Sequence, residues 1–90
     1  MFVVVSYDII DDKRRQKISQ KLEDYGKRVQ YSVFECILDE VKFKEMIKEL
    51  VSFIEEEDSL RFYNLCEGCL KRIKVFGMAE VTKDEDVYIV

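Results

Sequence analysis

Runs of apolar residues along the chain predict its β-strands. Residues 2–7 read FVVVSY, a short stretch rich in β-branched and aromatic side chains that is typical of a buried central strand. Residues 29–38 (VQYSVFECIL) are strand-like throughout, but the alternation fails across positions 32 and 33, which predicts two short strands joined by a tight turn. Two more strands are expected at residues 60–65 and 73–76.

Apolar positions three or four residues apart predict a helix over residues 12–25. Either Asp11 or Asp12 can cap its first turn, because an aspartate side chain accepts hydrogen bonds from the free backbone N–H groups there. Gly26 is expected to end the helix. The apolar face of this helix consists of Ile18, Leu22 and Tyr25.

A second helix has the clearest pattern in the chain. Its apolar residues follow the i, i+3, i+4, i+7, i+8, i+11 spacing of an amphipathic helix, and they are Phe43, Met46, Ile47, Leu50, Val51 and Ile54. An acidic run at residues 55–58 (EEED) follows, and its simplest interpretation is a solvated turn.

The predicted order of elements is β-α-β-β-α-β with further strands after it, which is the ferredoxin-like arrangement of the α+β class. We expect residues 1–90 to form one domain, with residues 78–90 as a C-terminal extension. The last four residues, 87–90, read VYIV, and such an apolar, β-prone end favours a strand added to a sheet edge. That edge can belong to the same subunit or to the partner in a homodimer.

Composition narrows the class of protein. The chain has 90 residues, 48% of them hydrophobic, with a formal net charge of −4, and it contains no stretch near the roughly 20 apolar residues of a membrane span. We therefore expect a soluble, cytoplasmic protein with no membrane partner. The sequence has no histidine and three glycines, which excludes Ser-His-Asp chemistry, a P-loop and a dinucleotide-binding turn. Two classes of function remain: catalysis by a carboxylate and a metal, or binding without catalysis.

Three cysteines are present, and two of them form a Cys-x-x-Cys pair, Cys66 and Cys69. A four-thiolate zinc site needs two such pairs, which a dimer could supply across its axis. The interpretation we favour is two reduced thiols at a strand end and in the turn after it. Cys36 lies in an apolar strand and is expected in the core.

Charge is segregated along the chain. Residues 13–28 contain seven basic and two acidic side chains, a balance of +5, and residues 61–74 carry +3. The other 60 residues carry −12. The simplest interpretation of residues 13–28 is a solvated helix face, but clustered arginines near the end of a strand that carries a carboxylate favour a phosphate site.

That carboxylate is Asp8, which directly follows an apolar strand. Asp8 is either a functional group or a cap for the next helix, for which Asp11 and Asp12 also compete. Mg²⁺ is held by one or two carboxylates while water and substrate phosphates complete its shell, so one aspartate per subunit, doubled by a two-fold axis, would suffice. Such an ion could activate water for in-line attack on a phosphodiester.

Several segments together resemble the signature of the Cas-two family, the small CRISPR-associated proteins of spacer acquisition. These segments are YDI at 7–9, DDKRRQK at 11–17, YGKRVQYSVFE at 25–35, RFY at 61–63 and the Cys-x-x-Cys pair. The resemblance implies a ferredoxin-like homodimer with exchanged C-terminal strands. It also implies endonuclease activity on single-stranded RNA or double-stranded DNA, and a place as the central dimer that bridges two integrase dimers while DNA lies across it.

The same resemblance implies that Asp8 is a Mg²⁺ ligand near the dimer axis. The next positions carried over by motif are Tyr7, Arg15, Arg28 and Phe34, while Lys17 stands where other members can have arginine. Two hypotheses follow: a metal-dependent endonuclease in which arginines neutralise the scissile phosphate, and a non-catalytic scaffold that binds DNA between integrase partners. A third alternative is a toxin-type ribonuclease of related fold, as in virulence-associated toxin proteins.

Overall fold

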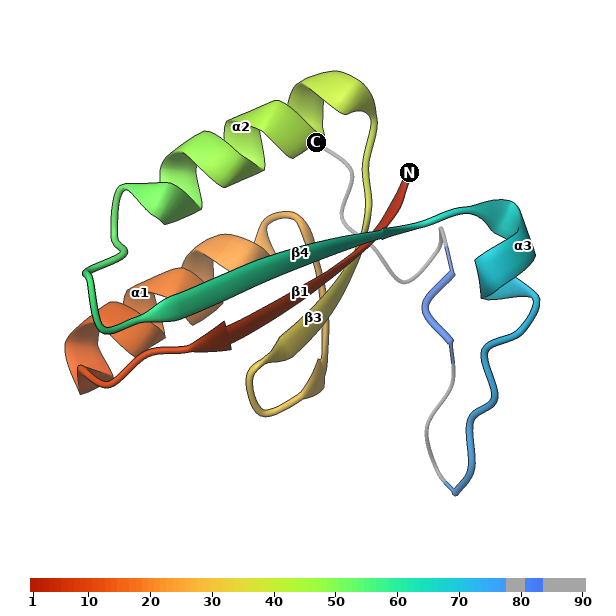
Figure 1. The fold of residues 1–90 in the computed structure, drawn as a ribbon, viewed down its shortest axis with the longest axis horizontal. Coiled ribbons are helices and arrows are strands. Elements are labelled where there is room, and N and C mark those ends of the chain that lie inside the picture. The colour runs from red at the N-terminus through yellow and green to blue at the C-terminus, as the bar shows by residue number, and fades with distance from the viewer. Residues whose placement is uncertain (78–80, 84–90) are drawn as a thin grey trace.

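In the computed structural model, one antiparallel sheet carries two helices on the same face (Figure 1). The structure describes residues 1–77 and 81–83. The elements in chain order are β1 (Phe2–Asp8), α1 (Asp12–Glu23), β2 (Gly26–Gln30), β3 (Val33–Ile37), α2 (Glu40–Val51), β4 (Ser59–Leu65) and α3 (Glu67–Leu70). The predicted β-α-β-β-α-β order and the ferredoxin-like α+β class are confirmed.

The strand order of the sheet is β2-β3-β1-β4. Strand β1 lies in the interior of the sheet, hydrogen-bonded to β3 on one side and to β4 on the other. Side chains alternate along β1, so Val3, Val5 and Tyr7 are buried against the helices, whereas Asp8 at the end of the strand is exposed. We call the side of the sheet opposite the helices the open face. The core beneath α1 and α2 includes Ile18, Leu22, Phe34, Cys36, Met46 and Leu50, which confirms the core position predicted for Cys36.

Helix α1 ends earlier than predicted. Asp11 caps its start, because its side chain accepts a hydrogen bond from the backbone N–H of Arg14 at 2.9 Å. The last helical residue is Glu23, and Gly26 does not end the helix but begins β2. A side chain at Gly26 would overlap the carbonyl oxygen of Glu35 on β3. This glycine is therefore needed for the close approach of two strands, a tertiary demand that the sequence pattern does not reveal.

The two short strands predicted within residues 29–38 are present. Their turn lies at Tyr31 and Ser32, one position earlier than expected, and β2 extends back to Gly26. The pairing of β2 with β3 is irregular between Arg28 and Gln30.

The second predicted helix is confirmed as α2, which Asp39 caps through a hydrogen bond from the N–H of Lys42 at 2.8 Å. Met46 and Leu50 are fully buried, as their spacing predicts, whereas Val51, also assigned to the apolar face, is 53% exposed. Ile54 lies beyond the end of the helix and still packs against the core.

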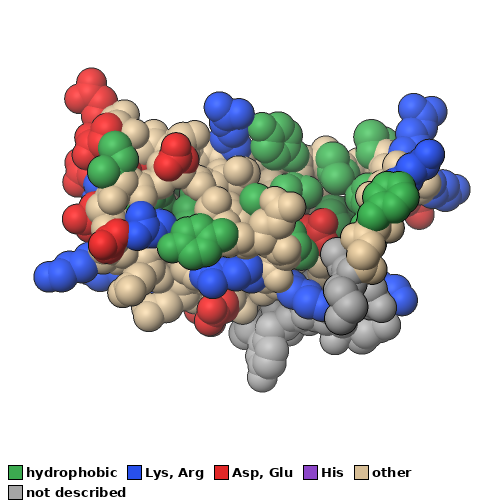
Figure 2. All heavy atoms as spheres, turned by 90° about the horizontal axis from the view of Figure 1, so that it is seen from below, with side chains coloured by type: hydrophobic (Ala, Val, Ile, Leu, Met, Phe, Trp, Pro, Cys, Tyr) green, Lys and Arg blue, Asp and Glu red, His purple; other side chains and the backbone are tan. Residues whose placement is uncertain are grey.

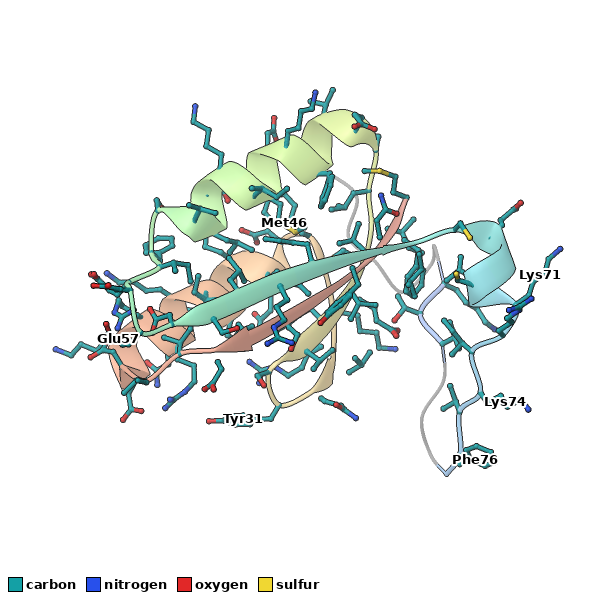
Figure 3. The ribbon with its side chains drawn as sticks, in the orientation of Figure 1. Tyr31, Met46, Glu57, Lys71, Lys74 and Phe76 are labelled. Carbon is teal, nitrogen blue, oxygen red and sulfur yellow. The ribbon has the colours of Figure 1, made fainter. Side chains whose placement is uncertain are left out.

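The strand predicted at residues 73–76 is wrong. After β4 the chain forms α3, and residues 73–76 then have no regular secondary structure. They belong to an arm, residues 71–77, that extends away from the sheet, and Phe76 on it is 85% exposed (Figures 1 and 3). High β-propensity did not produce a strand there because the arm pairs with no strand of the described part of its own chain. The strand predicted at residues 87–90 lies outside the described residues.

Within residues 1–77 and 81–83, no helix has the length and apolar character needed to cross a membrane.

Candidate functional site

Asp8 is the last residue of β1, opposite Ser59 of β4. Asp11 occupies the capping position of α1, so the alternative that Asp8 caps this helix is wrong. By alternation, Asp8 lies on the open face together with Val4 and Ser6. Among the described residues its carboxylate has no hydrogen bond or ion pair, which leaves both oxygens available to a ligand.

A hollow of about 390 Å³ lies between α1, β2 and the turn from β2 to β3. Three of the predicted site residues line it: Tyr7, Arg15 and Arg28. Its other lining residues are Gln16, Ser19, Gln20 and Tyr31. We call it the arginine hollow. The hydroxyl of Tyr7 donates a hydrogen bond to the carbonyl oxygen of Tyr31 at 3.5 Å, which joins β1 to the turn.

Arg28 reaches the arginine hollow from β2. Its guanidinium donates to the hydroxyl of Ser19 on α1 and lies over the ring of Phe34, 5.4 Å from the ring centroid. Phe34 is fully buried and its ring also stacks with that of Tyr7, with centroids 6.4 Å apart. Phe34 therefore supports Arg28 and Tyr7 from within the core and does not itself face the solvent.

Arg15 enters the hollow from the first turns of α1. Its guanidinium pairs with Asp12 and donates to the carbonyl oxygen of Ile9 at 3.0 Å. The hydrogen bond with Asp12 raises the pKa of Arg15 above its usual value, so the side chain is a permanent cation. A guanidinium has five N–H donors, so Arg15 keeps donors for an anion after making these two contacts.

The structure does not bring all predicted site residues together. Asp8 lies on the open face and does not line the arginine hollow, which is on the helix side of the sheet. Lys17 is directed to a different hollow with Lys21 and Phe53, where its ammonium is 6.0 Å from the Phe53 ring centroid.

Two exposed aromatic and basic features escaped the sequence analysis. Tyr31 is 75% exposed at the tip of the turn, where Figure 3 shows it pointing away from the sheet. Arg61 lies opposite Ser6 on β4, two positions from the partner of Asp8, and is therefore the diagonal neighbour of Asp8 on the open face. The position of Tyr31 in a short polar turn was a signal in the sequence that its side chain is exposed. The position of Arg61 beside Asp8 depends on the register of β4 against β1, for which the sequence carries no signal.

The acidic run at residues 55–58 is more than a solvated turn. The side chain of Asp58 is fully buried and pairs with Arg14, and one of its oxygens accepts from the N–H of Glu55 at 2.8 Å. Burial by itself would raise the pKa of Asp58, but hydrogen bonds from the Glu55 backbone and the Arg14 side chain lower it below the usual value. Arg14 is therefore a structural residue within the basic segment and is not free to bind phosphate.

The remaining charges are distributed unevenly over the surface. Figure 2 shows acidic side chains concentrated at one end of the molecule, whereas basic side chains are spread along it and include a group at the end where α3 and the arm lie. Lys71 and Lys74 extend outward from that end in Figure 3.

Asp8 is the candidate metal ligand on the open face. No group of three or more acidic, histidine or cysteine side chains converges anywhere in the described ranges. Mg²⁺ takes one or two carboxylates and fills its octahedral shell with water and phosphate oxygens. An exposed carboxylate without a protein partner fits that demand, provided that a second copy, water or nucleic acid supplies the other ligands.

Comparison with known proteins places this geometry in a family. The family model for CRISPR associated protein Cas2 matches residues 1–73. The chain is 49% identical over 88 residues to CRISPR-associated endoribonuclease Cas2 3 of Synechocystis sp., covering 97% of this chain and 96% of that protein.

Among solved structures, the chain is similar to Streptococcus pyogenes Cas2, with 36% identity, a TM-score of 0.74, and 86% of this chain and 100% of that chain covered. It is also similar to a chain of a partial Cas6-RT-Cas1–Cas2 complex, with 34% identity, a TM-score of 0.65, and 82% and 88% covered. Sequence, fold and motif positions thus agree, and the chain belongs to the Cas2 (Cas-two) family of CRISPR associated proteins.

Proposed function

We propose that this protein takes part in CRISPR adaptation as a homodimeric, Mg²⁺-dependent endonuclease that cleaves phosphodiesters in RNA or DNA. The observation that carries the proposal is the Asp8 carboxylate, exposed at the end of the central strand and without a partner among the described residues. This carboxylate has no packing or capping role, and its place at the end of the central strand, with both oxygens open to solvent, supports a role in ligand binding. The name of the Synechocystis relative, an endoribonuclease, supports the same class of activity.

Asp8 would hold the metal, and Arg61, its diagonal neighbour, would lie beside a bound phosphate. A Mg²⁺ ion at this position supplies Lewis-acid polarisation of a phosphodiester. The arginine hollow would bind a second phosphate of the same strand, because guanidinium groups such as those of Arg15 and Arg28 recognise phosphate oxygens through paired N–H donors. Tyr31 would present its ring to an unpaired base.

A homodimer would complete this site. Each chain offers one Asp8, and a two-fold axis that passes near the end of β1 would bring the second one. The open face supports such pairing, because Val4, Val33 and Ile37 on it are only half-buried in the single chain and Tyr63 is 47% exposed. We also propose that the C-terminal extension, residues 78–90, pairs with the partner subunit beyond Thr82, which is itself buried on its own chain and donates from its N–H to the Glu35 carboxylate at 3.2 Å.

A second function rests on a different observation. The solved complex that resembles this chain contains Cas1 together with Cas2, which supports an integrase as a partner. In this scaffold hypothesis the dimer bridges two integrase dimers and presents the arginine hollow to DNA, while Asp8 has no catalytic role. Because the chain belongs to the Cas2 family, we do not propose a toxin-type ribonuclease.

Replacing Asp8 with asparagine separates the two functions, because asparagine preserves the size of the side chain and removes its charge. In the enzyme hypothesis, Asp8→Asn lowers Mg²⁺-dependent cleavage of labelled single-stranded RNA or duplex DNA by about 100-fold or more and leaves the melting temperature unchanged. The matched control is Glu56→Gln, which removes one exposed carboxylate from the turn between α2 and β4.

The same two variants are then mixed with the integrase partner and a labelled DNA duplex. Integration that persists with Asp8→Asn supports the scaffold function beside the nuclease. Full cleavage by Asp8→Asn refutes the catalytic assignment, and loss of integration by a folded Asp8→Asn protein refutes a scaffold that works without this carboxylate.

A further inference from the structure

Two cysteines lie together where β4 passes into α3. Cys66 follows the last residue of β4 and occupies the position just before α3, and Cys69 lies within α3. Their sulfur atoms are 3.5 Å apart, and both residues are exposed. The third cysteine, Cys36, is buried in the core, so Cys66 and Cys69 are the thiols that a reagent in solution can reach.

The two thiols are not equivalent. The backbone amide of Cys69, followed by its thiol, lowers the pKa of Cys66. The interaction with Cys66 in turn raises the pKa of Cys69. Since the thiolate is the nucleophile in disulfide exchange, the lower pKa favours Cys66 as the attacking thiol, and Cys69, with its sulfur 3.5 Å away, is placed to resolve a mixed disulfide.

The surroundings of Cys66 admit a small reactant. A hollow of about 540 Å³ adjoins Cys66, and Phe2, Ile37 and Asn64 contribute to its lining. It lies between the end of β4, the start of β1 and α3, on the other side of the molecule from the turn that carries Tyr31 (Figure 3). Cys66 is thus exposed beside a hollow in which part of a small-molecule disulfide can lie.

A metal site is less well supported than a redox pair. Tetrahedral zinc needs four ligands, and in the described part of the chain no third cysteine, histidine or carboxylate joins these two sulfurs in a metal-binding group. Two adjacent thiols with different acidities are, by contrast, sufficient for reversible oxidation.

We propose that Cys66 and Cys69 form a reversible intramolecular disulfide by exchange with a small-molecule disulfide of the glutathione type. The Cys66 thiolate attacks one sulfur of oxidised glutathione, which forms a mixed disulfide and releases one glutathione thiolate. The Cys69 thiolate then attacks the sulfur of Cys66, which closes the protein disulfide and releases the second glutathione thiolate. The two protein thiols are oxidised, one glutathione disulfide is reduced to two thiols, and the two protein protons pass to the released thiolates.

Oxidation would tie α3 to the end of β4, and the arm of residues 71–77 continues directly from α3 (Figure 1). The pair lies apart from the arginine hollow, whose lining includes neither cysteine. The inference is independent of the nuclease and scaffold functions.

The test equilibrates the full-length protein with oxidised and reduced glutathione at defined ratios, traps free thiols by alkylation and counts the labels by mass spectrometry. We expect Cys66 and Cys69 to lose their labels together, with Cys36 still reduced in the folded protein and no glutathione retained. The folded protein should oxidise at a ratio of oxidised to reduced glutathione about tenfold lower than the urea-unfolded chain requires. Equal ratios for the folded and unfolded chains, a crosslink between two chains, or two thiols that resist oxidation overturn the proposal.

Single variants test the assigned order of attack. Cys69→Ser should retain glutathione on Cys66, because no resolving thiol remains, and Cys66→Ser should react with oxidised glutathione about tenfold more slowly at neutral pH. Cys36→Ala is the matched control, because it removes the third thiol without placing a hydroxyl in the core, and it should oxidise like the unaltered chain. Equal reaction rates for Cys66→Ser and Cys69→Ser contradict the order of attack. If Zn²⁺ alone protects both thiols from alkylation at a stoichiometry of one ion per two chains, the pair is a metal site and the disulfide assignment fails.

Discussion

The guanidinium of Arg28 lies 5.4 Å from the ring centroid of Phe34, an aromatic residue with no exposed surface. This contact, together with the hydrogen bond to Ser19, holds a charged side chain at the wall of the arginine hollow. A cation over an aromatic face gains about 0.5–1 kcal/mol at an exposed site. Phe34 is therefore a positioning residue for Arg28 as well as a core residue.

Replacing Arg28 with glutamine should weaken binding of duplex DNA about equally for all sequences. Each phosphate contact contributes about 0.9 to the slope of log affinity against log salt concentration, so the slope should fall by about that amount. The measurement is affinity at several salt concentrations. The control is Lys48→Gln on α2, which removes the same charge outside the hollow. An unchanged slope for both Arg15→Gln and Arg28→Gln would show that neither side chain contacts phosphate.

Removing the aromatic ring of Tyr31 should weaken binding of single-stranded nucleic acid more than binding of duplex. Stacking of an unpaired base on an aromatic ring contributes about 1–3 kcal/mol, and a base within a duplex is not available to this ring. Tyr31→Ala tests the loss and Tyr31→Phe keeps the ring as the control. Because Tyr31 is 75% exposed, neither change should affect the melting temperature. Equal losses on both kinds of nucleic acid would contradict stacking.

Asp58 should make the stability of the protein depend on pH in the acidic range. The pKa of Asp58 is lower in the folded than in the unfolded protein, so its contribution is present above the unfolded value of about 3.9 and is lost as pH falls through the folded value. Unfolding by urea, followed from pH 6 to pH 2, measures this loss. Asp58→Asn should be less stable near neutral pH and show a shallower pH dependence, whereas Glu56→Gln should behave like the unaltered protein. Identical pH profiles for the two variants would contradict the assignment.

Gly26→Ala should destabilise the fold by roughly 1–3 kcal/mol, because the added methyl group would overlap the backbone of β3 and force the two strands apart. Gly68→Ala is the matched control, since its methyl group would meet nothing closer than the sulfur of Cys66 at 3.8 Å. The measurement is the free energy of unfolding in urea. Equal stability of the two variants would mean that β2 can move away from β3 without cost.

Deleting residues 87–90 should convert a dimer into a monomer that keeps the fold of residues 1–77. The motive is the wholly apolar sequence VYIV, which favours pairing with a sheet edge. Sedimentation velocity of the shortened chain gives its mass in solution, and circular dichroism checks the fold. A shortened chain that remains a tight dimer refutes the exchanged strand.

Local patterns predict most of this fold, and the errors have identifiable physical causes. The spacing of Met46 and Leu50 predicts the face that α2 buries, because helical periodicity depends on the chain alone. Gly26 is predicted to end a helix, because glycine is favoured both at helix ends and where two strands approach closely, and the sequence does not distinguish these two uses. Residues 73–76 have high β-propensity, but a strand also needs a partner, and partners are a property of the whole fold.

The sequence predicts which residues belong to the candidate site, but it does not predict how they are arranged in space. Tyr7 and Asp8 are consecutive residues of one strand, and side chains alternate along a strand, so the two face opposite sides of the sheet. That rule alone separates Asp8 from Tyr7, whereas the position of Arg28 on the face of Tyr7 follows from the pairing of β2 with β3 and of β3 with β1. Arg61 is the diagonal neighbour of Asp8 on the open face, and this position depends on the register of β1 against β4, which no single strand encodes.

This placement on opposite faces has a genetic consequence for the proposed dimer. An Asp8 variant and an Arg28 variant damage surfaces that do not overlap, so a mixed dimer of the two chains retains one intact copy of each. Alleles of this kind complement each other when the intact surfaces work independently, and they fail to do so when one nucleic-acid strand must contact both surfaces of the same subunit. The sheet thus separates the two surfaces. Co-expression of the two variant chains shows whether one nucleic-acid strand must contact both surfaces of the same subunit.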